Sequence, residues 1–141
     1  MALLTPSLGS LFAISTALII ALTSPSRADE LPYPPTYFSM FRVDLMVAKD
    51  VAQNCPTVEI DRERYLELAE EQMQMIERDG FSRDNWQSEM KDIPVGLKDR
   101  PNVEFYMKWG IRRDRPESFC EAARMEQINR TRIGSLLRQI K

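Results

Sequence analysis

Two cysteines, Cys55 and Cys120, are the only cysteines in this 141-residue chain, and their positions constrain the fold more than any other feature. Proline and glycine divide the chain into segments with helical hydrophobic spacing. Cys55 lies at the end of the first segment and Cys120 in the first turn of the last. A disulfide between them would fix how the outer helices pack. Closing a loop of about 65 residues would contribute roughly 4 kcal/mol in the chain-entropy model.

The amino-terminal segment predicts export, and export provides the oxidising compartment in which a disulfide persists. The run Leu11–Leu22 is apolar but too short for a comfortable bilayer span of about 20 residues. Ser26 and Ala28 place small residues at the positions that a signal peptidase requires. We predict a signal peptide over residues 1–28, cleaved after Ala28, and a single periplasmic or secreted helical domain over residues 29–141. The alternative is an uncleaved inner-membrane signal anchor, because no lysine or arginine precedes the apolar run.

The residues leave two alternatives for the cysteines, a zinc site and a catalytic thiol. The chain has no histidine, which removes Ser-His-Asp and Cys-His catalysis and leaves a two-cysteine zinc site without its most common partner ligand. No base is placed to activate a thiol. A structural disulfide is therefore the favoured interpretation, and we expect no metal and no cofactor.

Hydrophobic spacing and punctuation predict an all-α fold, a small bundle of about four to five helices stapled by one disulfide. A first helix is predicted from Thr36, as its N-cap, to Cys55. A second helix is predicted over residues 60–79, with Gly80 as its left-handed cap. The rest of the chain is expected to form a short helix from Ser82, a loop over 91–101, a short helix over 103–109 and a long last helix over 116–139.

Two of these helices carry further signals. The buried face of the first helix is expected to carry six apolar residues at helical spacing: Phe38, Phe41, Leu45, Ala48, Val51 and Ala52. Asp114 and Glu117 form a variant of the capping box before the last helix, and Pro116 lies in its first turn. Strand signals are poor, because no turn dipeptide separates two alternating runs.

Three polar residues, Glu126, Asn129 and Arg130, share the apolar face of the predicted last helix. Burying an unpaired charge there would cost several kcal/mol. The favoured interpretation is a buried polar network, in which Glu126 and Arg130 pair with each other or cap a neighbouring helix end. The alternatives are a polar patch that lines a cleft or partner groove, and a helix that bends away from the core after Met125. Gly134, at the edge of this face, is expected to permit close helix packing.

Charge is unevenly distributed along the chain, with eight acids and three bases over residues 59–79 and four acids and nine bases over residues 105–141. The two regions could attract each other within one molecule, or the second could bind a partner. Basic and aromatic residues gather in the second region: Lys108, Trp109, Arg112, Arg113 and Arg115. This basic-aromatic surface could contact an acidic partner protein or an anionic membrane surface. The overall net charge of −2 argues against nucleic acid as a partner.

Several strings of residues resemble a known family: Asn54-Cys55, Asp79-Gly80-Phe81-Ser82, Ser118-Phe119-Cys120, Glu126 and Ile133-Gly134-Ser135-Leu136-Leu137-Arg138. Over about residues 40 to 138, the chain is similar to a family of short exported alphaproteobacterial proteins that is catalogued as a domain of unknown function. The resemblance implies an exported helical domain with a disulfide and no assigned activity. The chain departs from the family in the loop over 91–101, which is longer and richer in proline, so a site there could be its own.

These observations favour a non-catalytic interaction or accessory module of the cell envelope, with an envelope protein as its partner. No glycine-rich phosphate loop, nucleophile elbow or dinucleotide fingerprint is present, and we therefore expect no enzyme. One alternative is a small acid-stress periplasmic chaperone, because many carboxylates would be protonated at low pH and leave a cationic chain. Another is an enzyme that uses carboxylates alone, with Glu126 as acid or base.

Overall fold

Helices dominate the structure, as the sequence predicts. The computed structural model describes residues 31–93 and 95–140, so the predicted signal peptide over residues 1–28 lies outside the described residues. Within them the chain forms six helices, four of them longer than three turns, and two short strands. In chain order the elements are α1 (Thr36–Asn54), β1 (Val58–Ile60), α2 (Arg62–Arg78), α3 (Trp86–Glu89), α4 (Val95–Trp109), α5 (Pro116–Ile128), α6 (Arg132–Ser135) and β2 (Leu137–Gln139).

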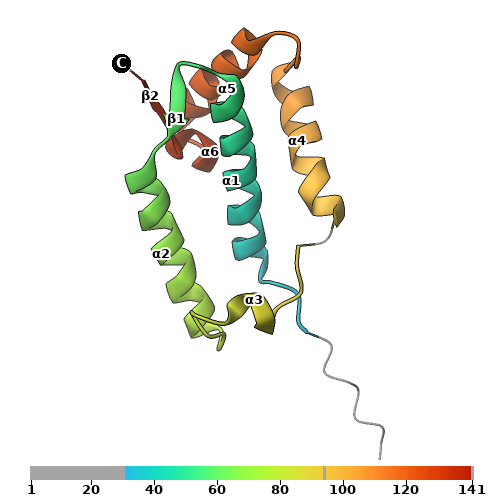
Figure 1. Ribbon diagram of the computed structural model, residues 1–141, viewed down its shortest axis with the longest axis vertical. Coiled ribbons are helices and arrows are strands. Elements are labelled where there is room, and N and C mark those ends of the chain that lie inside the picture. Colours follow the sequence, from blue (N-terminus) through green and yellow to red (C-terminus); the bar gives the residue numbers. More distant parts are fainter. Residues whose placement is uncertain (1–30, 94, 141) are drawn as a thin grey trace, which may run out of the picture. The chain divides into compact units, whose positions relative to one another are not determined.

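Helix α1 runs through the middle of the described domain (Figure 1). Helix α2 lies along one side of α1 and α4 along the other, while α5, α6 and the two strands gather near the carboxyl-terminal end of α1. Because α1 has neighbours on both sides, its buried residues cover more than the one face that the sequence predicts: Phe38, Ser39, Phe41, Val43, Val47, Ala48 and Val51.

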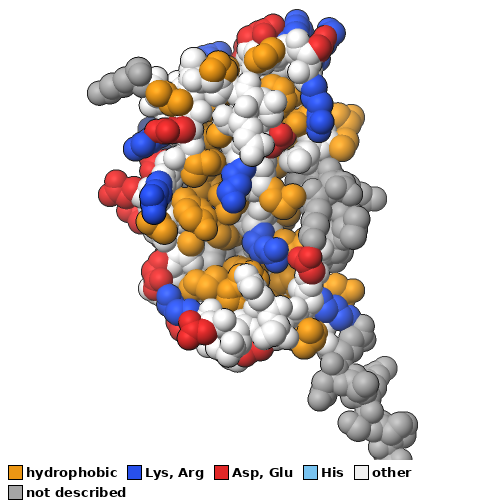
Figure 2. Space-filling model, viewed as in Figure 1, with side chains coloured by type: hydrophobic (Ala, Val, Ile, Leu, Met, Phe, Trp, Pro, Cys, Tyr) orange, Lys and Arg blue, Asp and Glu red, His pale blue; other side chains and the backbone are white. Residues whose placement is uncertain are grey.

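Two hydrophobic clusters form the core. The main cluster joins α1 to α4, α5 and the strands, and includes Phe105 and Phe119. A smaller cluster of Phe38, Ile76 and Met90 lies between α1, α2 and α3. Figure 2 shows further hydrophobic side chains at the surface between α1 and α2, with acidic and basic side chains beside them. The domain is therefore held together around α1.

Some local signals are confirmed and others are wrong. Gly80 follows α2 with φ 91°, as predicted for a left-handed cap. The residue that precedes α1 is Pro35 rather than Thr36, which belongs to the helix. Asp114 does not cap α5, because Arg115 occupies the N-cap position. The loop predicted over residues 91–101 is also wrong in its second half, since α4 already begins at Val95.

The carboxyl-terminal region departs most from the prediction. Helix α5 ends at Ile128, and the chain turns before it forms α6 and β2, so the helix predicted over 116–139 is wrong beyond that point. Strand β2 pairs antiparallel with β1, and Glu59 lies opposite Arg138. Their side chains form an ion pair at 2.7 Å. Each strand has only three residues, too few for an alternating pattern to be read from the sequence.

Candidate functional site: a groove beside a buried carboxylate

The predicted disulfide is present at the carboxyl-terminal end of α1. Cys55 follows α1 directly and Cys120 lies in α5, with their Sγ atoms 2.06 Å apart and their Cα atoms 5.0 Å apart. Cys55 is fully buried, whereas Cys120 is half-buried. The bond ties the end of α1 to the helix that carries Glu126.

Glu126 lies in the core of the described domain with 1% of its surface exposed. Its Oε1 atom accepts hydrogen bonds from Lys108 Nζ at 2.8 Å and from Trp109 Nε1 at 2.6 Å, and its Oε2 atom accepts one from the Thr131 hydroxyl. The first two donors lie at the end of α4 and the third is the N-cap residue of α6. One carboxylate thus joins α4, α5 and α6, and we call these four residues the Glu126 anchor.

The hydrogen-bond donors hold Glu126 in its ionised form. Burial by itself raises the pKa of a carboxyl group, because it disfavours the charged form. In Glu126 the hydrogen bonds from Lys108, Thr131 and Trp109 outweigh burial, so the pKa lies below its ordinary value. A general acid that works near neutral pH needs a raised pKa. The state of Glu126 therefore suits a structural role better than an acid role.

Thr131 and Gly134 place α6 directly against α5. The Thr131 hydroxyl accepts a hydrogen bond from the Gly134 amide at 3.0 Å, and in this way it caps α6. The same hydroxyl donates to Glu126 and is therefore also part of the Glu126 anchor. A Cβ atom on Gly134 would lie 2.2 Å from the backbone oxygen of Glu126. This contact has no room for a side chain, and the expected close packing at Gly134 is confirmed.

The predicted polar network is right about the burial of Glu126 and wrong about its partners. Asn129 follows α5 as its C-cap, and Arg130 adopts the left-handed conformation with φ 52°. Both side chains are exposed, because the turn removes them from the face that a continued helix would have buried. The cation that pairs with Glu126 is Lys108, from another helix.

The structure divides the basic-aromatic surface between different environments. Lys108 and Trp109, which lie on α4, belong to the Glu126 anchor. Arg112 forms an exposed ion pair with Asp114 at 2.8 Å. Arg113 lies over a tyrosine ring of α4, with 5.7 Å between the guanidinium carbon and the ring centre. Arg115 is exposed at the start of α5.

A groove of about 390 Å³ opens between α1, α4 and α6 beside the anchor. Val43, Val47 and Phe105 line it and are themselves buried, so the floor of the groove is apolar. Ile133 and Met40 also line it, and Met40 is 44% exposed. We call this feature the α1–α4 groove. Its volume and its mixture of apolar surface with a few polar groups are typical of binding sites.

Two ion pairs line the α1–α4 groove, Lys108–Glu126 at 2.8 Å and Arg132–Asp44 at 2.7 Å. In each pair the cation is exposed and the carboxylate is covered: 55% against 1%, and 40% against 14%. Burial raises the pKa of Asp44, and Glu126 adds to the increase while Arg132 opposes it. Glu104 is an exposed acid at the same groove. A ligand would meet both cations before their carboxylates.

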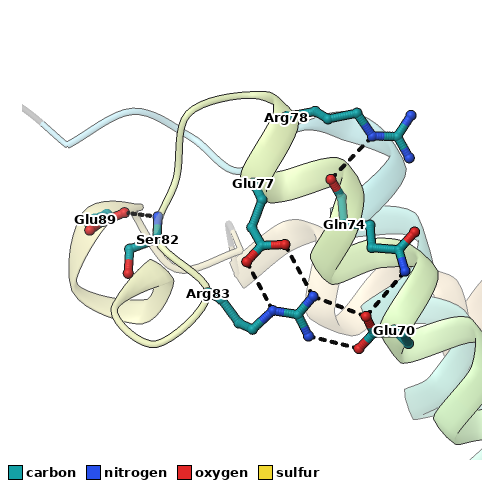
Figure 3. A network of polar contacts seen from close by, with 7 residues as sticks. All are labelled: Glu70, Gln74, Glu77, Arg78, Ser82, Arg83 and Glu89. Atoms are coloured by element: carbon teal, nitrogen blue, oxygen red, sulfur yellow. Dashed lines mark hydrogen bonds and ion pairs between the residues drawn. The ribbon is translucent and has the colours of Figure 1, made fainter.

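A second charged cluster lies on α2 and the segment that follows it (Figure 3). The Arg83 guanidinium donates to both oxygens of Glu70, at 2.7 and 3.0 Å, and to both oxygens of Glu77, at 2.9 and 3.1 Å. Hydrogen bonds from Arg83 and Gln74 lower the pKa of Glu70 to about 2, and those from Arg83 lower the pKa of Glu77. All three charged side chains are partly exposed. We call Arg83, Glu70 and Glu77 the Arg83 clamp.

Sequence reasoning missed several residues at the groove, among them Asp44, Thr131 and Arg132. One signal was available for Thr131, because threonine is a common N-cap and Asn129, two residues before it, is of a type that often ends a helix. No local signal marks the Arg132–Asp44 pair, since the partners lie on helices that are distant in the chain.

Two further features are absent from the described part of the chain, a membrane-spanning helix and a cluster of metal ligands. No helix there combines the length and the hydrophobicity that crossing a bilayer requires. Among residues 31–93 and 95–140, no three acidic or sulfur-bearing side chains gather closely enough to hold a metal ion.

Comparison with known proteins places the chain in a family. The chain belongs to DUF5333, a family of unknown function, and the match covers residues 36–138. No curated protein and no solved structure matches the chain. The matched region includes the disulfide, the Glu126 anchor and the α1–α4 groove.

Proposed function

We propose that this chain is a non-catalytic binding module of the cell envelope, which holds an apolar side chain of a partner protein in the α1–α4 groove. The observation that carries the proposal is the groove itself, with its buried apolar floor and the exposed Met40 at its side. Methionine adapts its shape to irregular contacts and is common on binding surfaces. The helices that border the groove are also fixed relative to each other, because the Glu126 anchor links α4, α5 and α6 by hydrogen bonds.

The charges at the groove suggest the chemistry of the partner segment. Lys108 and Arg132 are the exposed members of their ion pairs, and each retains donors beyond the bond that its carboxylate accepts. A partner that places an acidic residue next to its apolar side chain would pair with these cations while the apolar group fills the groove. We therefore propose an acidic and apolar protein segment as the ligand.

The disulfide supports a location for the module outside the reducing cytosol. A disulfide indicates an oxidising compartment, and with the apolar run at the amino terminus this supports the periplasm or the exterior after cleavage following Ala28. An uncleaved signal anchor would hold the same domain at the inner membrane, where the exposed Arg113 and Arg115 could contact an anionic surface. The acidic net charge of −2 favours a protein partner over a nucleic acid.

Site-specific photo-crosslinking tests the proposal in intact cells that express the full chain. One variant carries a photo-crosslinking amino acid in place of Met40, at the groove, and the control carries it in place of Leu66, on α2. The two positions are similarly apolar and are 44% and 55% exposed. We expect a discrete adduct from position 40 and none of the same mass from position 66.

A second pair of substitutions shows whether the adduct depends on the groove. In the chain with the crosslinker at position 40, Ile133→Asp places a negative charge inside the groove, while Ile128→Asp places it at an exposed position of α5 that does not line the groove. The adduct should disappear with the first substitution and persist with the second. Persistence with both, or loss with both, would contradict the groove as the binding site.

A further inference from the structure

The two sulfur atoms of the disulfide differ in their surroundings. Cys55 is 0% exposed and belongs to the main hydrophobic cluster. Cys120 is half-buried and lines an open groove of about 580 Å³ on the surface of α5, separate from the α1–α4 groove. Thiol–disulfide exchange requires a thiolate to approach one sulfur directly, so access decides which sulfur is attacked. Only the Cys120 side offers such an approach within the described residues.

Most of the residues that line the groove beside Cys120 have a polar or charged end, and we call it the disulfide groove. Its lining residues come from α5, from the turn before β1 and from β2: Thr57, Cys120, Glu121, Arg124, Gln127 and Gln139. Arg124 is 59% exposed and lies at 3.9 Å from Glu121, at the outer limit of an ion pair. A cation beside a sulfur favours the approach of a thiolate, and side-chain amides suit a peptide-like molecule.

Thr57 is placed to assist the bond cleavage. Its hydroxyl lies 3.2 Å from Cys55 Sγ and 3.7 Å from Cys120 Sγ. A disulfide sulfur carries no hydrogen, so the hydroxyl is the donor in both contacts. The nearer sulfur is the buried one. A hydroxyl that donates to Cys55 Sγ would stabilise the negative charge that forms there when the bond breaks.

We propose that the disulfide exchanges with peptide thiols through Cys120 alone, and that Cys55 is the leaving sulfur. In this step the thiolate of the incoming peptide forms a new S–S bond with Cys120 Sγ. The Cys120–Cys55 bond breaks, and its electron pair leaves with Cys55 Sγ as a thiolate that accepts a hydrogen bond from Thr57. The incoming sulfur is oxidised to the disulfide level and Cys55 is reduced. The reverse step, attack of the Cys55 thiolate on the mixed disulfide, closes the native bond again.

Two single-cysteine variants of the full chain test the assignment, with oxidised glutathione as the probe. Cys55→Ser leaves only the Cys120 thiol, and Cys120→Ser leaves only the Cys55 thiol, so both variants lack the same disulfide. Mass spectrometry follows the glutathione adduct with time. We expect Cys120 to react at least about tenfold faster than Cys55 in the folded variants, because Cys55 is buried and only Cys120 lines an open groove. In urea the two rates should converge.

The wild-type chain gives a second measurement that does not depend on how the variants fold. The oxidised protein is treated with reduced glutathione and quenched with N-ethylmaleimide, and the peptides are mapped. Glutathione should be found on Cys120 and the maleimide on Cys55 in the trapped mixed disulfide. Thr57→Val should slow the reduction about threefold or more by raising the pKa of the leaving thiol, whereas Thr36→Val, at the exposed start of α1, should not change it. Glutathione on Cys55, or equal rates for the two thiols in folded variants, would overturn the proposal.

Discussion

The Glu126 anchor and the Arg83 clamp use the same chemistry, a carboxylate that binds a cation, in opposite environments. In the anchor the carboxylate is 1% exposed and its donors come from two other elements. In the clamp the arginine side chain is 38% exposed, and its two carboxylates, both on α2, are 51% and 44% exposed. Judged by the number of short hydrogen bonds alone, the clamp would be the stronger cluster.

Burial reverses that ranking. Water already solvates the charges of an exposed cluster well, so pairing them adds little to stability. A buried carboxylate has lost its water, so each donor that is removed leaves a desolvated charge with fewer hydrogen bonds and nothing to replace them. The anchor should therefore determine the positions of α4, α5 and α6, whereas the clamp should only steady the segment after α2.

The largest effect should follow from neutralising the anchor. Glu126→Gln removes the charge that Lys108 and Trp109 bind and puts an amide donor where Thr131 also donates. We expect a loss of about 3 kcal/mol in the free energy of unfolding, because the buried side chain loses its charge-assisted hydrogen bonds and its amide is left without an acceptor. Urea unfolding followed by circular dichroism measures this loss. An effect no larger than that of an exposed substitution such as Glu121→Gln would contradict the structural role of Glu126.

The stability of the domain should also depend on pH through the ionisation of Glu126. The pKa of Glu126 is lowered on folding, so its contribution is present above the ordinary carboxyl pKa of 4.5 and is lost as the pH falls through the lower value of the folded state. Asp44 acts with the opposite sign, because its pKa is raised. Urea midpoints measured from pH 7 downward should therefore fall more steeply below pH 4.5 in the wild type than in Glu126→Gln. Parallel curves would exclude Glu126 as a source of the dependence.

A steric substitution next to the anchor should have the next largest effect. Gly134→Ala would bring a Cβ atom within 2.2 Å of the Glu126 backbone oxygen, and backbone atoms cannot move aside cheaply. We expect a loss of about 2 kcal/mol. Gly110→Ala is the matched control, since its Cβ would meet nothing within 4 Å and only the positive φ of 61° opposes it, at about 1 kcal/mol. Equal losses would show that the α5–α6 contact is not tightly packed.

The smallest effect should come from the clamp. Arg83→Ala removes four hydrogen bonds, yet every charge involved stays in contact with water. The melting temperature should change least of all these variants, and the change should vanish in about 1 M salt, where the screening length is only about 3 Å. A loss as large as that of Glu126→Gln, or one insensitive to salt, would show that the two clusters do not differ as burial suggests.

The predictable parts of this fold are those that local patterns determine. The first two helices, the Gly80 cap and the pairing of Cys55 with Cys120 follow from spacing, punctuation and the cysteine count. The residues that indicate a helix or its cap lie within a few positions of each other in the sequence. For the disulfide, a chain with two cysteines allows only one pairing within the molecule. The helix predicted over 116–139 was wrong because residues 137–139 pair with β1, which lies far away in the chain, and no local pattern reveals that pairing.

The groove could be predicted only in part, because its parts meet through tertiary contacts. The polar face of the last helix correctly indicated Glu126, but its partner Lys108 lies on another helix. Val43 and Val47 were missed because a helix flanked on both sides buries a second face, which one hydrophobic stripe does not reveal. The Arg132–Asp44 pair was missed because Arg132 lies in α6, whereas the sequence predicted one continuous helix over 116–139.

The most direct test combines the two clusters with the proposed groove. The photo-crosslinker is placed at position 40 in the Glu126→Gln background and in the Arg83→Ala background, at a temperature where circular dichroism shows both variants folded. If the Glu126 anchor shapes the groove and the groove binds the partner, the adduct should be lost in Glu126→Gln and retained in Arg83→Ala. An undiminished adduct in Glu126→Gln would contradict the link between the buried carboxylate and binding.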